Sequence, residues 1–265
     1  MEAGIPQFIE VGKGEDARKI AVRHDARGAQ GVLWLSGFKS DMLGSKAEVL
    51  AQWAEEHELT CTRMDYSGHG ESEGAFTDGT ISRWLEEVKT VFAQFCKGPT
   101  VVIGSSMGGW MALLLAKALQ EATLGSGHLN GIVLVAPAPD FTEELMWKHE
   151  FSEAVKQQIM ETGRYERPSD YDEPYIITRA LIEDGRRNLL LDAPIATGCP
   201  ITILQGQRDE AVPWKHALRI VEGAMSEDVL LTLVKDGDHR LSRPEDLERM
   251  CDAVAALCVK SKAGD

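Results

Sequence analysis

Hydrophobic and polar positions along the chain follow two repeating patterns. Short continuous apolar runs are typical of strands covered on both faces, and they occur at residues 31–35, 101–103 and 131–135. Further strand candidates lie at residues 61–66, 201–204 and 229–234. Apolar residues at helical spacing are typical of amphipathic helices, and they occur at residues 45–56, 81–95, 213–224 and 244–259. Residues 7–11 and 19–24 predict an opening antiparallel hairpin. The chain therefore predicts an α/β fold in which a mostly parallel sheet carries helices on both faces.

Residues 138–193 interrupt this alternation. They contain several aromatic residues and a loose helical texture, but no strand pattern. The alternation resumes at residue 201. We therefore predict one core domain, formed by residues 1–137 and 194–265, and a small helical cap, formed by residues 138–193 and inserted after the sixth strand.

The segment TVVIGSSMGGWMALLL, residues 100–115, joins a predicted strand to a predicted helix through a glycine-rich turn. The letters GSSMG within it fit the G-x-S-x-G motif, and strand, tight turn and helix are the context that a nucleophile elbow requires. Glycines beside such a turn avoid clashes between Cβ atoms and the strand and helix. The helix N-terminus favours developing negative charge. We predict that Ser106 is a catalytic nucleophile.

A serine nucleophile needs a base within hydrogen-bond reach and an acid that orients the base. Ligands of parallel α/β sheets bind at the carboxyl ends of the strands. Asp209 lies in the loop after the strand at 201–204, and His239 lies in the loop after the strand at 229–234. Serine, then acid, then histidine is the order found in hydrolases with this elbow. We predict Asp209 as the acid and His239 as the base.

Other residues compete for these roles. Asp140 follows the strand at 131–135 and is the alternative acid. His69 stands between two glycines but precedes the serine, so we expect it to shape its loop rather than act as the base. A purely structural interpretation remains for Asp209, as the cap of the following helix, and for His239, as a surface histidine.

An acyl-transfer site also needs two preorganised backbone donors for the oxyanion. Met107 follows the predicted nucleophile directly, and its amide is the first candidate. The second donor is expected from the loop after the strand at 31–35, where Gly37 permits a turn and the Phe38 amide can face the elbow. Phe38 and Met107 are therefore the predicted oxyanion hole.

Composition excludes several classes of partner. The formal net charge of −14 over 265 residues argues against nucleic acid and against an anionic membrane surface, which both select basic patches. No apolar run approaches the ~18 residues of a membrane span. The five cysteines are scattered without metal-ligand spacing, which predicts buried, reduced thiols. The N-terminus has no pattern of a signal or transit peptide, so we expect a cytoplasmic protein.

Four regions together resemble the α/β-hydrolase superfamily over nearly the whole chain. They read SGFKSDM, RMDYSGHGES, GSSMGGW and the pair QGQRDEAVPW and DGDHRL. Their combination is similar to the branch of palmitoyl-protein thioesterases and acyl-glucuronide esterases, whose animal members are mitochondrial. The superfamily's usual His-Gly before the oxyanion residue is here Ser36-Gly37. The resemblance implies an α/β-hydrolase fold, the triad and oxyanion residues named above, and hydrolysis of thioesters or carboxylic esters without a cofactor.

Three functions follow as hypotheses. The first is a serine hydrolase that forms an acyl-enzyme and acts as an acyl-protein thioesterase or acyl-glucuronide esterase. The second is a general carboxylesterase or lactonase for small substrates, and the third is a non-catalytic ligand-binding protein of the same fold. Candidate residues of an acyl pocket are the apolar and aromatic residues of the cap, Phe141, Met146, Trp147, Phe151, Met160, Tyr165, Tyr171 and Tyr175. Candidates for meeting an acidic substrate are Arg164, Arg167 and Arg179.

Overall fold

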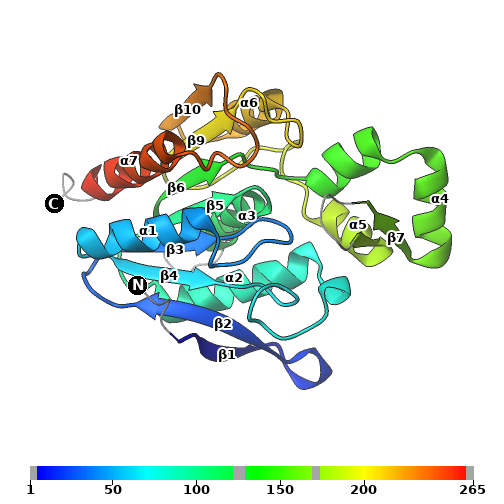
Figure 1. The fold of residues 1–265 in the computed structure, drawn as a ribbon, viewed down its shortest axis with the longest axis horizontal. Coiled ribbons are helices and arrows are strands. Elements are labelled where there is room, and N and C mark those ends of the chain that lie inside the picture. Colours follow the sequence, from blue (N-terminus) through cyan, green and yellow to red (C-terminus); the bar gives the residue numbers. More distant parts are fainter. Residues whose placement is uncertain (1–4, 122–128, 169–173, 261–265) are drawn as a thin grey trace.

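A computed structural model of the protein describes residues 5–121, 129–168 and 174–260. Within them, eight strands form one sheet in the order β1-β2-β4-β3-β5-β6-β9-β10 (Figure 1). The strands are β1 (Gln7–Val11), β2 (Arg18–Asp25), β3 (Gly31–Leu35), β4 (Thr60–Met64), β5 (Thr100–Ser105), β6 (Leu129–Val135), β9 (Ile201–Gly206) and β10 (Val229–Val234). β2 pairs antiparallel with β1 and β4, and every other pair is parallel. The predicted opening hairpin and mostly parallel sheet are confirmed.

Helices cover both faces of this sheet, as predicted (Figure 1). They are α1 (Ser45–Glu56), α2 (Ile81–Phe95), α3 (Met107–Glu121), α6 (Trp214–Gly223) and α7 (Pro244–Lys260), with short 3₁₀ turns η1 (Gly14–Asp16) and η2 (Phe76–Asp78). The first two helices begin and end at the predicted residues. At the start of α2, the Thr80 side chain accepts a hydrogen bond from the backbone N–H of Arg83, as a helix N-cap does.

Two hydrophobic cores lie on opposite faces of the sheet. Successive side chains of a strand point to opposite faces, so β3 sends Leu33 and Leu35 into the core beneath α2, α3 and α6. Its neighbouring residues Val32 and Trp34 enter the core beneath α1 and α7. All five residues of β3 are buried. Burial on both faces explains why the strand reads as a continuous apolar run.

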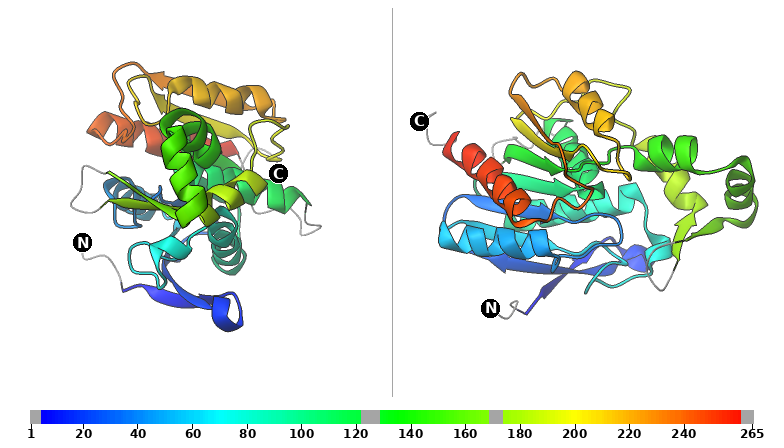
Figure 2. Two further views of the ribbon diagram at one scale, coloured as in Figure 1. Left: turned by 90° about the vertical axis from the view of Figure 1, so that its right-hand side faces the viewer. Right: turned by 45° about the horizontal axis from the view of Figure 1, so that its top comes forward.

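The segment between β6 and β9 extends from one end of the sheet (Figures 1 and 2). Its elements are the π-helical segment η3 (Thr142–Glu150), α4 (Glu153–Thr162), β7 (Arg164–Arg167), β8 (Tyr175–Thr178) and α5 (Arg179–Arg187). The prediction of no strand in this segment is wrong, because β7 and β8 form a two-stranded antiparallel sheet. Each strand has only four residues and no residue of β7 is buried, so β7 shows no apolar run and that of β8 is only three residues long. Gly163, with φ of 83°, ends α4 and directs the chain into β7.

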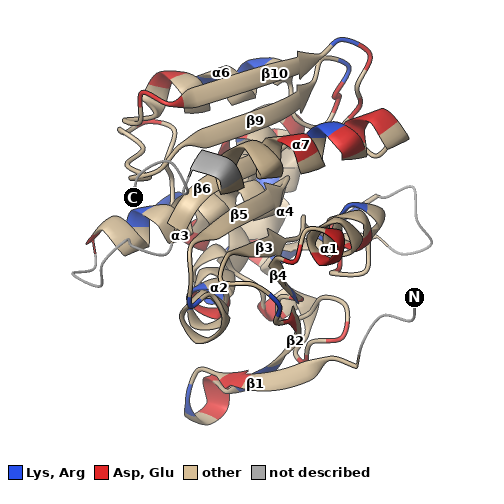
Figure 3. Cartoon of the chain, turned by 90° about the vertical axis from the view of Figure 1, so that its left-hand side faces the viewer, with Lys and Arg blue, Asp and Glu red and all other residues tan. Residues whose placement is uncertain are grey.

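The surface carries charges of both signs, interspersed over the helices and loops in the view of Figure 3. None of the helices in the described ranges is both long and apolar enough to cross a membrane. All five cysteines are buried and free, as predicted.

Candidate active site

The predicted nucleophile elbow is a sharp turn between β5 and α3. Ser106 has φ of 53°. This left-handed conformation is energetically unfavourable for any residue that has a Cβ atom. Its N–H donates to the carbonyl of Val135 at 2.9 Å, which ties the turn to the neighbouring strand. A Cβ atom at Gly104 would lie 2.2 Å from the carbonyl oxygen of Gly108, so the turn closes only with glycine there. Ser106 therefore stands at the carboxyl end of β5, directly before the N-terminus of α3.

The other two predicted triad residues meet this serine. Nε2 of His239 lies 3.1 Å from Oγ of Ser106, and Nδ1 of His239 lies 2.8 Å from Oδ2 of Asp209. The Asp209 side chain is fully buried, whereas the His239 side chain is 33% exposed. Three loops after β5, β9 and β10 thus form one continuous chain of hydrogen-bonding groups. The exposed histidine edge leaves a route for substrate.

The carboxylate of Asp209 is held by three further donors. Its Oδ1 accepts hydrogen bonds from the backbone N–H groups of Ala211 at 3.0 Å and Val212 at 2.7 Å. Its Oδ2 accepts a bond from Nε2 of the buried Gln205 at 3.1 Å. The following helix α6 starts after Pro213 without a side-chain cap, so Asp209 does not cap it. Sequence reasoning missed Gln205, whose signal is a single amide side chain at the carboxyl end of the mostly apolar strand β9.

The alternative acid Asp140 lies elsewhere. Its carboxylate accepts hydrogen bonds from the backbone N–H groups of Leu190 and Leu191, at 2.8 to 3.0 Å. Burial raises the pKa of Asp140 to about 6. The side chain therefore connects the start of the inserted segment to its end, whereas Nδ1 of His239 is bound by Asp209.

The loop after β3 lies against the nucleophile. A Cβ atom at Gly37 would stand 3.3 Å from Cβ and 3.9 Å from Oγ of Ser106, which brings the backbone before Phe38 close to the serine. Met107 opens α3 on the other side of Ser106. The indole N–H of Trp34 donates to Oγ of Ser36 at 3.0 Å. The oxyanion role of Phe38 and Met107 stays a prediction.

The Phe38 side chain packs in an aromatic cluster that joins the core to the inserted segment. Its ring centroid lies 4.9 Å from that of Phe76 and 6.1 Å from that of Trp84, both in the core. From the inserted segment, Phe141 lies at 5.4 Å and Tyr175 at 6.3 Å. Aromatic pairs at these distances stabilise the packing. The cluster therefore anchors the loop beside Ser106.

A cavity of about 670 Å³ opens beside Ser106 and His239. Of the predicted pocket residues, Tyr175 lines it. Phe141 packs on Phe38 and Trp110 instead. The others are not among its lining residues: Met146 and Phe151 are buried in the core, Tyr165 packs on Phe151, Trp147 lies against Arg186, and Met160 is half exposed. Tyr171 lies outside the described residues.

Basic side chains of the core, rather than of the inserted segment, surround the cavity. Its lining includes Lys39, Lys46 and Arg240. The Lys46 ammonium donates to the carbonyl of Arg240 at 2.5 Å, which connects α1 to the loop of His239. The predicted anion contacts Arg164, Arg167 and Arg179 are absent from the lining. Within the described ranges, no three His, Cys, Asp or Glu side chains form a group that could hold a metal ion.

Comparisons with known proteins agree with this fold and geometry. A hydrolase family model described as serine aminopeptidase, S33, matches residues 30–180. The mitochondrial palmitoyl-protein thioesterase ABHD10 of Pongo abelii is 31% identical over 233 residues, which are 87% of this chain and 73% of that protein. The human protein of the same name is 30% identical over the same shares.

Two solved structures resemble the whole chain. A putative hydrolase from Agrobacterium vitis S4 is 46% identical with a TM-score of 0.92, and the match covers 95% of this chain and 98% of that one. Mouse α/β hydrolase domain-containing protein 10 is 26% identical with a TM-score of 0.84, covering 96% and 99%. With these relatives and this elbow, the chain belongs to the α/β-hydrolase family and is a serine hydrolase.

Proposed function

We propose that this protein hydrolyses thioesters or carboxylic esters through a triad of Ser106, His239 and Asp209. The observation that carries the proposal is the unbroken hydrogen-bonded sequence from Oγ of Ser106 through both ring nitrogens of His239 to the buried carboxylate of Asp209. A neutral imidazole whose Nδ1–H donates to a carboxylate presents an unprotonated Nε2 to the serine. That arrangement makes the serine a nucleophile.

The reaction proceeds in two halves. Oγ of Ser106 bonds to the acyl carbon while its proton moves to Nε2 of His239, and the oxyanion takes hydrogen bonds from the amides of Phe38 and Met107. The tetrahedral intermediate then expels the thiol or alcohol, which receives the proton from His239, and an acyl-enzyme remains. Water attacks the acyl carbon, gives its proton to His239, and releases the acid and the free serine.

Long-chain acyl thioesters are the substrate class that we propose first. The support is the likeness to proteins named palmitoyl-protein thioesterase, over 87% of this chain. A second candidate is a general carboxylesterase or lactonase for small polar substrates. The polar residues that line the cavity favour it: Ser40, Asp41, Lys46, Arg240 and Ser242.

Labelling with a fluorophosphonate tests the chemistry. We expect an adduct on the peptide that contains Ser106, detected by mass spectrometry, in the wild type and in the matched control Ser105→Ala. Ser106→Ala should take no label and should lose on the order of 10⁶ in turnover, because triad members act as a unit. An unlabelled, folded wild type would overturn the proposal in favour of a non-catalytic ligand-binding protein.

A substrate panel separates the two substrate classes. A palmitoyl-cysteine peptide, an aryl acetate and a small lactone are compared by kcat/KM, with Ser106→Ala as the background. We expect the palmitoyl thioester to have the largest value. A larger value for the acetate or the lactone would select the small-substrate esterase.

A further inference from the structure

His69 contacts the loop of Phe38 and takes no part in the proposed triad. It lies in the loop after β4 and is 5% exposed. Its Nε2 accepts a hydrogen bond from the backbone N–H of Lys39 at 3.1 Å, across 30 residues of sequence. An imidazole nitrogen accepts only when it carries no proton. The Nδ1–H of the ring must then be the donor to the carbonyl of Ser67, at 3.2 Å.

The hydrogen bond from Lys39 selects one of two conformations of a β-turn. The N–H of Ser40 donates to the carbonyl of Gly37 at 3.1 Å, which closes the turn. Lys39 has φ of 59°, and Phe38 is not among the residues with positive φ, so the turn is of type II. Types I and II differ by a flip of the central peptide, here the one between Phe38 and Lys39.

Lys39, the third residue of this turn, makes the type II form unfavourable on its own. A type II turn favours glycine there, and a left-handed residue with a Cβ costs about 1–2 kcal/mol. Lys39 therefore favours the type I turn when nothing else acts on it. In type I the N–H of Lys39 would turn away from His69, so the bond to Nε2 opposes the flip. The turn beside the nucleophile is thus held by a contact from another loop.

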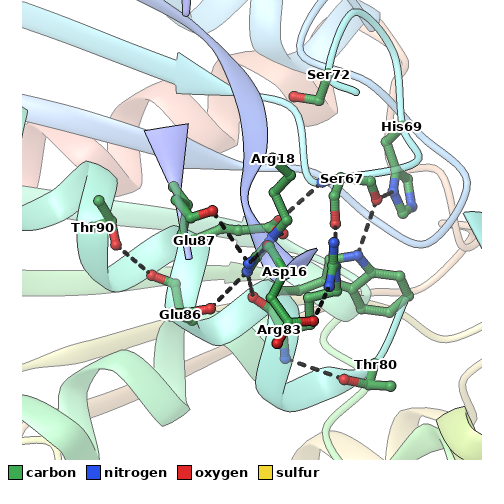
Figure 4. Close-up of polar contacts among 12 residues, drawn as sticks. Asp16, Arg18, Ser67, His69, Ser72, Thr80, Arg83, Glu86, Glu87 and Thr90 are labelled. Atoms are coloured by element: carbon green, nitrogen blue, oxygen red, sulfur yellow. Dashed lines mark hydrogen bonds and ion pairs between the residues drawn. The ribbon is translucent and has the colours of Figure 1, made fainter. Parts of the chain in front are cut away.

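The ring of His69 is itself held rigidly. Its centroid lies 5.3 Å from those of Phe76 and Trp84. The N–H of Ser67, whose carbonyl binds the ring, donates at 2.9 Å to the fully buried Glu87, which pairs with Arg18 (Figure 4). Burial lowers the pKa of His69 to about 4, so Nε2 remains an acceptor at neutral pH.

We propose that His69 is a positioning residue for the oxyanion hole. By accepting from Lys39, Nε2 of His69 holds the turn at residues 37–40 in its type II form and so restrains the position of the loop that carries the Phe38 amide. A flip to type I would reverse the Phe38 carbonyl and the Lys39 N–H, and it would release this loop from the contact with His69. The inference rests on the proposed function, because it assumes that the Phe38 amide binds the oxyanion. Preorganised donors stabilise a transition state because they need no reorganisation when charge develops.

Two substitutions separate this role from packing. His69→Phe keeps an aromatic ring but removes the acceptor, whereas His69→Gln restores an acceptor oxygen. We expect His69→Phe to lower kcat for an aryl ester by about 10- to 100-fold, since losing a whole oxyanion donor costs about 10²–10³, with KM little changed. His69→Gln should recover most of kcat. The matched control is His24→Phe, because His24 likewise makes a hydrogen bond through a ring nitrogen, to the hydroxyl of Thr62, and packs on an aromatic ring, that of Phe95.

The affinity for an alkyl trifluoromethyl ketone distinguishes a positioning role of His69 from a role in packing alone, which would leave this affinity unchanged. The ketone forms a tetrahedral oxyanion on the serine, so its inhibition constant should rise in His69→Phe by the same factor by which kcat falls. A loss of kcat with unchanged ketone affinity would overturn the inference, as would full activity of His69→Phe beside an active wild type. An inactive, unlabelled wild type would instead overturn the proposed function.

Nitrogen NMR of the wild type tests the inference without substitution. We expect the ¹⁵N shifts of His69 at neutral pH to report a protonated Nδ1 and an unprotonated Nε2. A proton on Nε2 would overturn the inference, because that nitrogen could not then accept from Lys39. This measurement decides the matter even where His69→Phe does not fold.

Discussion

Replacing Asp209 by asparagine gives the sharpest test of the proposed acid. Oδ1 of Asp209 binds two backbone N–H groups, those of Ala211 and Val212. The asparagine oxygen can keep these bonds, which places its NH₂ group where Oδ2 now accepts from His239 and Gln205. An NH₂ group only donates. His239 must then accept at Nδ1 and carry its proton on Nε2, the nitrogen that faces the serine.

This change of tautomer sets the expected magnitude. A proton on Nε2 prevents His239 from taking the proton of Ser106, although the geometry of the site survives. The corresponding substitution in serine proteases lowers kcat by about 10⁴, which corresponds to about 5.4 kcal/mol in the activation free energy. We expect Asp209→Asn to lower kcat by this order, because the carboxylate is fully buried and water cannot replace its oxygen.

The assay is steady-state hydrolysis of an aryl ester at pH 7 to 8, with fluorophosphonate labelling of the same samples. Asp140→Asn is the matched control, since Asp140 is also a buried aspartate in a loop after a strand but binds Leu190 and Leu191. We expect its kcat to stay within a few-fold of wild type. A nearly neutral Asp209→Asn together with an inactive Asp140→Asn would refute the assignment of the acid.

Two predictions concern the fold. Arg18→Met should lower the free energy of unfolding, measured by urea denaturation, by about 3–5 kcal/mol, because it leaves the fully buried Glu87 without its cation. The control Arg27→Met breaks the exposed pair with Glu55 and should lower that free energy by less than about 1 kcal/mol. Similar losses in both variants would contradict this. The second prediction concerns pH. Burial raises the pKa of Asp140 from 3.8 to about 6, so the folded protein holds this proton more tightly than the unfolded chain. The free energy of unfolding of the wild type minus that of Asp140→Asn should therefore fall as the pH rises from about 4 through 6; a rise would show that the ionised form is the favoured one.

Local patterns were enough to find most elements and the order of the candidate site. The limits of α1 and α2 agree with the periodicity of their sequences, because each helix buries one stripe of its own side chains. Ser106, Asp209 and His239 could be predicted to lie together because each follows a strand of a parallel sheet. Strand ends on one edge of a sheet meet in space, so position along the chain implied proximity.

Contacts between loops could not be found in this way. The bond from Lys39 to His69 depends on how two loops that are 30 residues apart face each other. The bond from Gln205 to Asp209 spans only four residues, but it forms because the turn after β9 folds back onto the end of that strand. Periodicity indicates only which face of a helix or strand is buried, not which group of another segment a side chain contacts. The short strands β7 and β8 were not predicted, because four residues with few buried side chains are too short to show a strand pattern.

The lining of the cavity is likewise a property of the tertiary structure. The aromatic residues of the inserted segment were all candidates for the pocket, yet Phe141 packs on core rings while Tyr175 lines the cavity. The basic side chains at the cavity come instead from the core, Lys39, Lys46 and Arg240. The sequence determines the chemistry of each side chain, whereas the packing of segments that are distant in sequence determines which residues it contacts.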